Sequence, residues 1–345
     1  MKFAPILLAG LAAACAPPAS QAQDPQPAAA TKAPISEKAP VSGLQLDFPV
    51  ACEIGATCEV QNYVDRDPGP GAQDYRCGSN TYEAHGGVDI RIPDMAAQAA
   101  GVEVLAAAPG RVARLRDGVP DISVTERGKA ALQGQDCGNG IVVDHGNGWE
   151  TQYCHLARGS LKVKVGDQVA AGTPIARIGL SGNTEYPHLH LTVRKDGTMV
   201  DPSAPEGACD PASSGAGLWS APAAQAMAYK SGAVLNTGFA GAPVSMAAIE
   251  AGGLARPTAA SALVAYVRAI NLQGGDIQEL TLKAPDGAVV VTSVQPALDR
   301  AKAQYFMMAG KKAQANGWPR GRYVATYAVK RGGKVVISRT FDVAL

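Results

Sequence analysis

Short strand-like runs separated by glycine turns recur through most of this sequence, and they constrain the fold more than any other feature. In the region 44–210 they occupy 88–92, 102–115, 140–156, 161–179 and 188–202. The run 140–156 holds Gly-Asn-Gly near its centre, which is a hairpin turn signal. No long amphipathic helix pattern competes with these runs. The region 44–210 is therefore predicted to be an antiparallel β domain.

The region 215–345 is predicted to be a second, smaller domain, since a chain of 345 residues fits two domains. Alternating apolar runs at 262–272, 278–294 and 321–343 are separated by Asp-Gly and Gly-Gly turns. This pattern is typical of an immunoglobulin-like β-sandwich. The segment 296–315 is interpreted as helical. The region contains neither histidine nor cysteine, so we expect it to pack, position or bind rather than to catalyse.

The N-terminus reads as an export signal followed by a flexible linker. A lysine precedes a short apolar run that ends in small residues, and the run is too short to cross a bilayer. Cleavage after Ala22 is one interpretation, which makes residues 1–22 a signal peptide. The other is a lipobox-like "LAAAC" that leaves Cys15 acylated. Residues 23–43 are rich in Pro, Ala and charge and predict a flexible linker. We expect an exported protein of the periplasm or cell envelope, either soluble or lipid-anchored.

Cysteine usage supports export. The sequence has seven cysteines, and setting Cys15 aside leaves six. An even number in an exported chain indicates disulfides, for which six cysteines allow 15 connectivities. The favoured pairs are Cys137–Cys154, which flank the predicted hairpin, Cys52–Cys58, which are close in sequence, and the remaining Cys77–Cys209. Buried free thiols are the alternative, and the lack of a CxxC spacing disfavours a zinc cluster of cysteines.

All five histidines lie in the first predicted domain, which makes that domain the candidate functional region. They are His85, His145, His155, His188 and His190. On a β-strand, residues i and i+2 point to the same face, so "HLH" aims His188 and His190 into one space. His85 and Asp89 lie four residues apart, and the two glycines between them argue against a helix. We expect these glycines to let the chain turn so that both side chains reach one ion.

These residue types predict a zinc site. Neutral imidazole and carboxylate bind Zn²⁺ well, and catalytic zinc commonly keeps three protein ligands with one position open. An HxxxD pair alone is a weak signal, and an HxH alone is often an ordinary strand. Their conjunction in the domain that holds every histidine is a much stronger signal. His145, which precedes a turn glycine, is interpreted as structural.

At these positions the sequence resembles the M23 zinc metallopeptidases, the LytM and lysostaphin-type peptidoglycan endopeptidases. The resemblance covers residues 44–210. It implies that His85, Asp89 and His190 bind Zn²⁺ through the HxxxD and HxH motifs. It implies that His188 and His155, the latter in a Tyr-x-His-Leu setting, form the catalytic pair. A β-rich domain with a groove on its sheet is expected, as is zinc-assisted hydrolysis of amide bonds in peptidoglycan stem or cross-bridge peptides. An insertion at 116–135 and the cysteine pattern depart from the family, which leaves groove shape and substrate choice open.

Other classes of function are weighed against an enzyme. Some relatives in this family have lost ligands and activate other hydrolases, so a non-catalytic wall-binding module or hydrolase activator is the alternative. No ligand position is lost here, which favours an enzyme. A lipoyl-like carrier, suggested by the turns of 163–179, lacks the Met-Lys-Met tip of such domains. The formal net charge is +1 without a basic tract, which disfavours a nucleic-acid partner. The expected partner is peptidoglycan, with the second domain binding the wall or a protein regulator.

Overall fold

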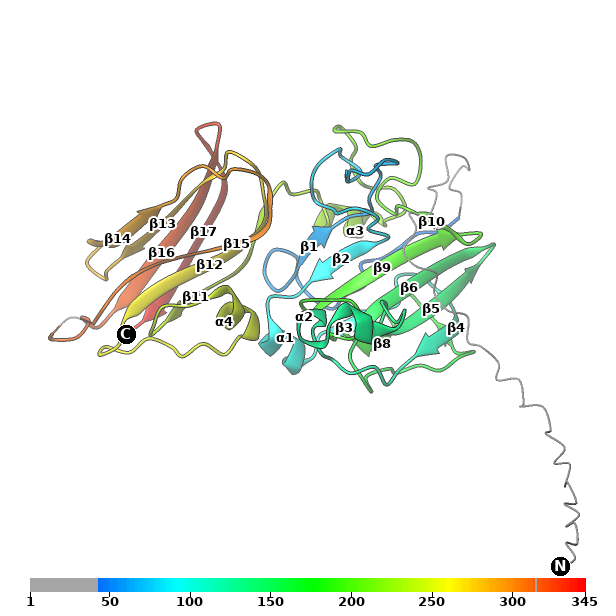
Figure 1. Ribbon diagram of the computed structural model, residues 1–345, viewed down its shortest axis with the longest axis horizontal. Coiled ribbons are helices and arrows are strands. Elements are labelled where there is room, and N and C mark those ends of the chain that lie inside the picture. Colours follow the sequence, from blue (N-terminus) through cyan, green and yellow to red (C-terminus); the bar gives the residue numbers. More distant parts are fainter. Residues whose placement is uncertain (1–42, 314) are drawn as a thin grey trace, which may run out of the picture.

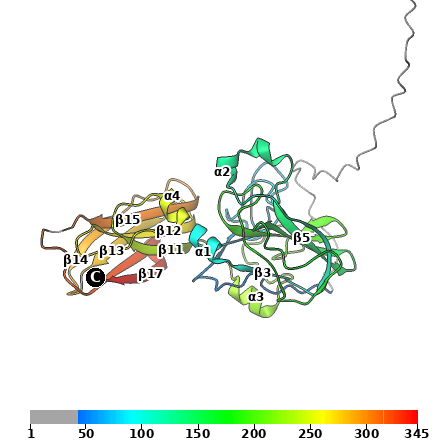
Figure 2. The same ribbon diagram turned by 90° about the horizontal axis from the view of Figure 1, so that it is seen from below.

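The computed structural model describes residues 43–313 and 315–345, which form two β-rich domains (Figure 1). The domains lie side by side in both views, and helix α1 (Met95–Ala100) of the first packs against helix α4 (Met246–Ala251) of the second (Figures 1 and 2). Within these described ranges, no helix has the length and apolar character needed to cross a membrane. The proposed signal peptide, Cys15 and nearly all of the proposed linker lie outside the described residues.

One antiparallel sheet of eight strands organises the larger domain and confirms the predicted fold class. Its order is β1-β2-β9-β6-β5-β4-β7, and β10 pairs with β9. The strands are β1 (Glu59–Asn62), β2 (Val88–Arg91), β4 (Gly110–Arg116), β5 (Asn139–Gly146), β6 (Trp149–Leu156), β7 (Gln168–Val169), β9 (His188–Lys195) and β10 (Thr198–Val200). Strands β3 (Glu103–Leu105) and β8 (Pro174–Arg177) form a separate pair. The remaining helical turns of this part of the chain are α2 (Val124–Arg127), η1 (Lys129–Leu132) and α3 (Ala221–Ala226).

The predicted hairpin of 140–156 is confirmed as β5 and β6. Gly146 pairs with Trp149, so the turn consists of Asn147 and Gly148. Their φ angles are 50° and 77°, a left-handed conformation that Asn and Gly adopt at little cost. This turn type matches the twist of the flanking strands and fixes their register.

The period-two alternation of β9 separates the hydrophobic core from the face that carries the histidines. Leu189, Leu191 and Val193 are buried in the main core of the domain. His188 and His190 alternate with them and therefore occupy the other face. Each buried aliphatic side chain stabilises the fold by about 1.5–3 kcal/mol. A one-residue slip of β9 would exchange the two faces, so core burial also fixes the histidines in place.

The C-terminal domain is a sandwich of two antiparallel sheets over one core, which confirms the predicted second β domain. One sheet has the order β11-β12-β15, and the other has the order β14-β13-β16-β17. The strands are β11 (Ala233–Ala240), β12 (Leu263–Leu272), β13 (Ile277–Lys283), β14 (Val289–Val294), β15 (Lys302–Lys311), β16 (Arg322–Arg331) and β17 (Lys334–Ala344). The hydroxyl of Tyr323, at the start of β16, donates to the carbonyl of Pro319 at 2.9 Å. This contact corresponds to the tyrosine corner of immunoglobulin-like sandwiches.

Two expectations for this part of the chain are wrong. The segment 296–315 is not helical, because β15 lies within it and pairs with β12 along nearly its whole length. Ladder pairing and packing thus override the helical preference of its Ala, Lys and Met residues. The first part of 215–345 also does not belong to the sandwich. Leu218, Trp219 and Met227 are buried in the core of the larger domain instead.

All three favoured disulfides are present. They are Cys52–Cys58, Cys77–Cys209 and Cys137–Cys154. The third joins Cys137, just before β5, to Cys154 near the end of β6, directly beside His155. It therefore restrains the strand end from which one of the candidate site residues projects.

Candidate metal centre and catalytic pair

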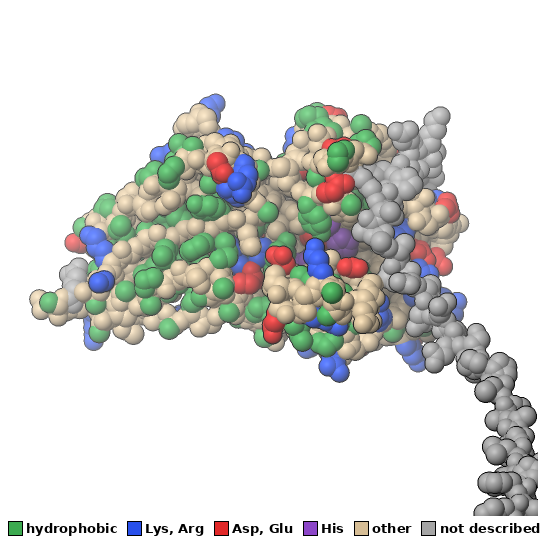
Figure 3. Space-filling model, viewed as in Figure 1, with side chains coloured by type: hydrophobic (Ala, Val, Ile, Leu, Met, Phe, Trp, Pro, Cys, Tyr) green, Lys and Arg blue, Asp and Glu red, His purple; other side chains and the backbone are tan. Residues whose placement is uncertain are grey.

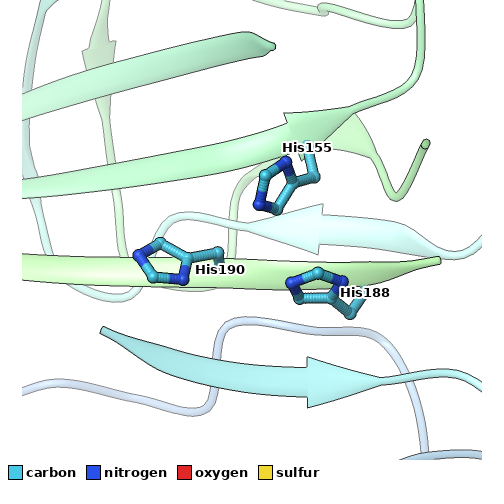
Figure 4. A group of neighbouring side chains, drawn as sticks. All are labelled: His155, His188 and His190. Atoms are coloured by element: carbon cyan, nitrogen blue, oxygen red, sulfur yellow. The ribbon is translucent and has the colours of Figure 1, made fainter. Parts of the chain in front are cut away.

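The sheet brings together the five residues that the sequence motifs single out. Asp89 on β2 lies opposite His190 on β9, and His190 lies opposite Cys154 on β6. His155 follows Cys154 on β6, and its φ of 61° departs from the strand conformation that would turn it to the other face. Figure 4 shows its ring with those of His188 and His190 around one space. His85 approaches from the segment before β2. In Figure 3 histidine atoms are visible at the bottom of a hollow in the surface of the larger domain.

His85, Asp89 and His190 form the tightest group. Nδ1 of His190 lies 2.8 Å from Oδ1 of Asp89, and Nε2 of His85 lies 3.1 Å from Oδ2 of the same carboxylate. The two nitrogens are 3.2 Å apart. Ligand atoms of a tetrahedral zinc site, at 2.0–2.1 Å from the ion, are separated by about 3.3 Å. The triad thus has the donor types and spacing of a zinc site.

Hydrogen bonds around the two imidazoles set which nitrogen faces this triad. Nδ1 of His85 donates to the carbonyl of Tyr63 at 2.7 Å, which leaves the lone pair of Nε2 directed at Asp89. Nε2 of His190 lies 3.1 Å from the hydroxyl of Thr192, and that hydroxyl donates its only proton to Gly86 O at 2.9 Å. Nε2 of His190 is therefore the protonated nitrogen, and Nδ1 presents a lone pair. Two lone pairs and a carboxylate facing one point fit a divalent cation.

The pKa shifts of Asp89 and His85 also fit a site for a divalent cation. Burial alone would raise the pKa of Asp89, but His85 and His188 hold it well below its ordinary value, so the carboxylate is ionised. Asn62 donates to Oδ2 of Asp89 at 2.9 Å and orients it. Burial lowers the pKa of His85, and Asp89 more than offsets this, so the pKa is raised overall. The field that favours a proton on His85 also favours a metal cation, and the two compete for the same lone pair.

His155 and His188 form a second pair beside the triad, with ring centroids 4.7 Å apart. Nδ1 of His155 donates to Ser181 O at 2.8 Å, and Nδ1 of His188 donates to Tyr186 O at 2.9 Å. In both rings Nε2 is then the nitrogen that faces the site, and that of His188 lies 3.4 Å from Oδ1 of Asp89. Burial, reinforced by the neighbouring histidines, holds the pKa of His155 well below its usual value. A neutral His155 is suited to accept a proton.

His190 belongs to two possible metal-binding sets in the described residues. Its ring nitrogens lie within 4.8 Å of those of His155 and His188, as well as of the ligand atoms of His85 and Asp89. Of the two sets, only the second contains a carboxylate, and each of its two nitrogens lies 2.8–3.2 Å from the other nitrogen and from one oxygen of Asp89. We therefore propose His85, Asp89 and His190 as the ligands.

Several supporting residues escape prediction from the sequence. Thr192 carries a detectable signal, because it follows His188 and His190 on the same strand face. Asn62 and the carbonyls of Tyr63 and Ser181 carry none, since nothing in their local sequence links them to the motifs. His145 lies outside the cluster, bonded to Pro109 O at 2.7 Å and to the hydroxyl of Thr151 at 2.8 Å.

The two glycines of the HxxxD motif act differently from the expectation. Neither Gly86 nor Gly87 has a positive φ. A Cβ on Gly87 would lie 2.6 Å from Nε2 of His190, whereas a Cβ on Gly86 would meet only the flexible Met199 side chain, at 3.0 Å. Gly87 is therefore required because the His190 ring approaches the backbone, and not because the chain must turn there.

The insertion 116–135 supports the loop that holds His155 and His188. It contains α2 and η1, and the amide of Val124 donates to Thr184 O at 2.9 Å. Asp121 accepts from the amide of Leu180 at 2.7 Å. These bonds anchor the loop 180–186, which supplies the carbonyls of Ser181 and Tyr186 to the two histidines.

Comparison with known proteins finds matches in the same region of the chain that holds this cluster of residues. Residues 83–202 match the model of Peptidase family M23. The peptidoglycan DD-endopeptidase ShyA of Vibrio cholerae is 48% identical over 67 residues, which are 19% of this chain and 14% of the relative. The murein hydrolase activator EnvC of Escherichia coli is 42% identical over 62 residues, covering 18% of this chain and 14% of the relative. Among solved structures, the catalytic domain of the M23 protein EnpA from Enterococcus faecalis aligns with a TM-score of 0.31 and 20% identity, over 45% of this chain and 95% of that one.

The fold and the site define an antiparallel β-sheet domain with a histidine and aspartate cluster of metal-binding type. Residues 83–202 form a domain that matches Peptidase family M23, and one relative of this region is named as a peptidoglycan DD-endopeptidase. The chain spans only 14% of the length of either named relative.

Proposed function

We propose that this protein is an exported zinc-dependent endopeptidase that hydrolyses amide bonds in the stem or cross-bridge peptides of peptidoglycan. The observation that carries the proposal is the paired arrangement of the site. Three inward-facing acceptors, from His85, Asp89 and His190, adjoin two histidines whose outer nitrogens are fixed by main-chain carbonyls. A binding-only module has no need for the second pair.

The five residues divide the chemistry between them. Zinc, when held by His85, Asp89 and His190, supplies a Lewis acid that polarises the scissile carbonyl and makes water more acidic. His155, neutral because burial lowers its pKa, accepts the proton of the attacking water through Nε2. In its protonated form, in which both ring nitrogens carry hydrogen, His188 donates from Nε2 a hydrogen bond to the developing oxyanion or a proton to the leaving amine. Ser181 O and Tyr186 O each accept from Nδ1, so Nε2 of both rings is the nitrogen that takes part in the reaction.

Two further features support an envelope substrate. The three disulfides fit an oxidising compartment, and the relative from Vibrio cholerae is named as a peptidoglycan DD-endopeptidase. We extend the proposal to zinc as the resident metal and to the periplasm or cell envelope as the location. A lipid anchor at Cys15 and wall or regulator binding by the second domain remain predictions.

A hydrolase activator is the second candidate, because one relative bears that name. An activator acts through a protein partner and does not need an intact site. The two functions therefore differ in what the purified protein does alone. Mass spectrometry of muropeptides released from purified sacculi by the zinc-loaded protein separates them, with His188→Ala as the matched control. New amine termini that depend on zinc and on His188 establish the endopeptidase, and release only upon addition of a second hydrolase establishes the activator.

A further inference from the structure

Arg91 is a fully buried cation, and one side of its guanidinium group faces the second domain. It lies at the end of β2, opposite His188 on β9, and none of its surface is exposed. Its Nη2 lies 2.5 Å from Oε2 of Glu250, a residue of helix α4. Among the described residues Glu250 is the carboxylate that forms an ion pair with Arg91. The second domain thus supplies the negative charge that pairs with Arg91, a residue of the eight-stranded sheet.

Glu250 is itself held in place within the second domain. Nη1 of Arg268, on β12, donates to the same Oε2. The other end of the Arg268 guanidinium donates to Pro93 O, in the turn after β2. Arg268 is also completely buried. The carboxylate therefore bridges two buried guanidinium groups, one from each domain, and a buried charge that loses its partner is strongly destabilised.

Arg91 contacts Tyr186 in two ways. Its guanidinium carbon lies 3.7 Å from the centre of the Tyr186 ring, a cation–π contact. Its Nη1 donates to Oε1 of Gln61 at 2.8 Å, and Nε2 of Gln61 donates to the Tyr186 hydroxyl at 2.9 Å. The ring and the hydroxyl of Tyr186 are therefore both fixed by Arg91.

Tyr186 in turn fixes His188. The carbonyl of Tyr186 accepts the proton of Nδ1 of His188 at 2.9 Å, and the two rings lie 5.2 Å apart. A shift of Tyr186 would thus move both the acceptor and the neighbouring ring that determine how His188 is turned. This gives a continuous path of direct contacts from α4 to the catalytic pair.

We propose that Glu250 is a positioning residue for His188, acting from the second domain through Arg91 and Tyr186. The proposal rests on the hydrolytic role assigned to His188 above. It gives the second domain a part in catalysis although that domain contributes no group to the metal centre. Losing the charge of Glu250 is expected to lower turnover by roughly 10- to 100-fold, the scale of a misplaced catalytic group.

The test uses the full chain with Glu250→Gln, which removes the charge at nearly constant size. Arg339→Gln is the matched control, because Arg339 also bonds across the domain boundary, to Gly55 O at 2.7 Å, without touching Arg91. On a soluble cross-linked muropeptide, we expect kcat to fall in Glu250→Gln with KM changed less than about twofold and zinc content unchanged. Arg339→Gln should match the wild type. Glu250→Asp, which keeps the charge, should lose less activity than Glu250→Gln.

A second readout does not depend on activity. In protein labelled with ¹⁵N-histidine the chain gives only five imidazoles, and the signals of His188 should shift in Glu250→Gln while those of His145 stay in place. Tyr186→Leu should move the same signals, and the double variant should be no worse than Tyr186→Leu alone, since the coupling runs through that ring. Unchanged His188 signals in folded Glu250→Gln overturn the proposal. If the wild type hydrolyses nothing, the proposed function fails, and the His188 signals alone still decide the coupling.

Discussion

The hydroxyl of Thr192 accepts a hydrogen bond from Nε2 of His190 at 3.1 Å and donates one to Gly86 O at 2.9 Å. This pair of bonds selects the tautomer of His190 that faces Asp89 with a lone pair. A partner of this kind around a metal-binding histidine typically contributes 10- to 100-fold to metal affinity.

Thr192→Val should therefore lower zinc affinity by roughly 10- to 100-fold without unfolding the protein. Thr192→Ser keeps the hydroxyl and should stay close to the wild type. Competition with a chromophoric chelator measures both affinities. Equal zinc affinity in the valine and serine variants would show that the hydroxyl does not set the tautomer.

Gly87→Ala should displace His190. The added Cβ would lie 2.6 Å from Nε2 of that ring and 2.6 Å from Leu191 O, which belongs to the paired backbone of β9, so the ring must shift. Gly86→Ala is the control, because its Cβ meets a methionine side chain that can rotate away. We expect zinc content to fall in Gly87→Ala alone, as measured by atomic absorption on folded protein. Full zinc content in Gly87→Ala would contradict the close-approach explanation.

Much of this site follows from local sequence rules, and the rest depends on contacts between distant segments. Strand periodicity places His188 and His190 on one face, and the motif resemblance adds His85, Asp89 and His155. The prediction that Gly87 serves as a turn residue is wrong, because its constraint comes from the His190 ring, 103 positions further along the chain. Tyr186 and Glu250 become relevant only once the two domains pack together.

The wrong prediction of a helix at 296–315, where the structure has strand β15, has a similar origin. Its residues favour a helix when taken alone, but pairing with β12 and burial of Met307 and Ala309 in the sandwich core decide the outcome. Local propensity is a weak guide where a segment completes a sheet. The α3 segment shows the same limit, since its composition does not say which of two cores it joins.

Removing the Cys137–Cys154 disulfide should affect both stability and turnover. His155 has a φ of +61°, and its amide donates to Cys137 O at 2.8 Å, so the disulfide helps to hold an unfavourable backbone conformation. The double variant to alanine should lose about 2–4 kcal/mol of unfolding free energy in urea titrations. Its turnover should fall further than in the matched Cys52/Cys58 variant, which lacks a link to the site. Equal turnover in the two variants would remove the positional role.

The unfolding free energy should fall as the pH drops below about 6.5, the usual histidine value. Burial lowers the pKa of His145 in the folded protein, and it also lowers that of His155. The unfolded chain therefore binds these protons first, and stability is lost on acidification and regained as the pH rises. His145→Gln should remove its share of this dependence and make the slope smaller, as measured by urea titrations between pH 7.5 and 5. An unchanged slope would show that this histidine is not the source.

The most direct test of the account compares zinc content and turnover in single alanine variants of the five site residues. His85→Ala, Asp89→Ala and His190→Ala should lose both. His155→Ala and His188→Ala should keep close to one zinc per chain while their turnover of a cross-linked muropeptide falls roughly 10²–10⁴-fold, the range for a lost general acid or base. Loss of zinc from His155→Ala would make that residue a ligand, and full activity in it would contradict the proposed catalytic pair.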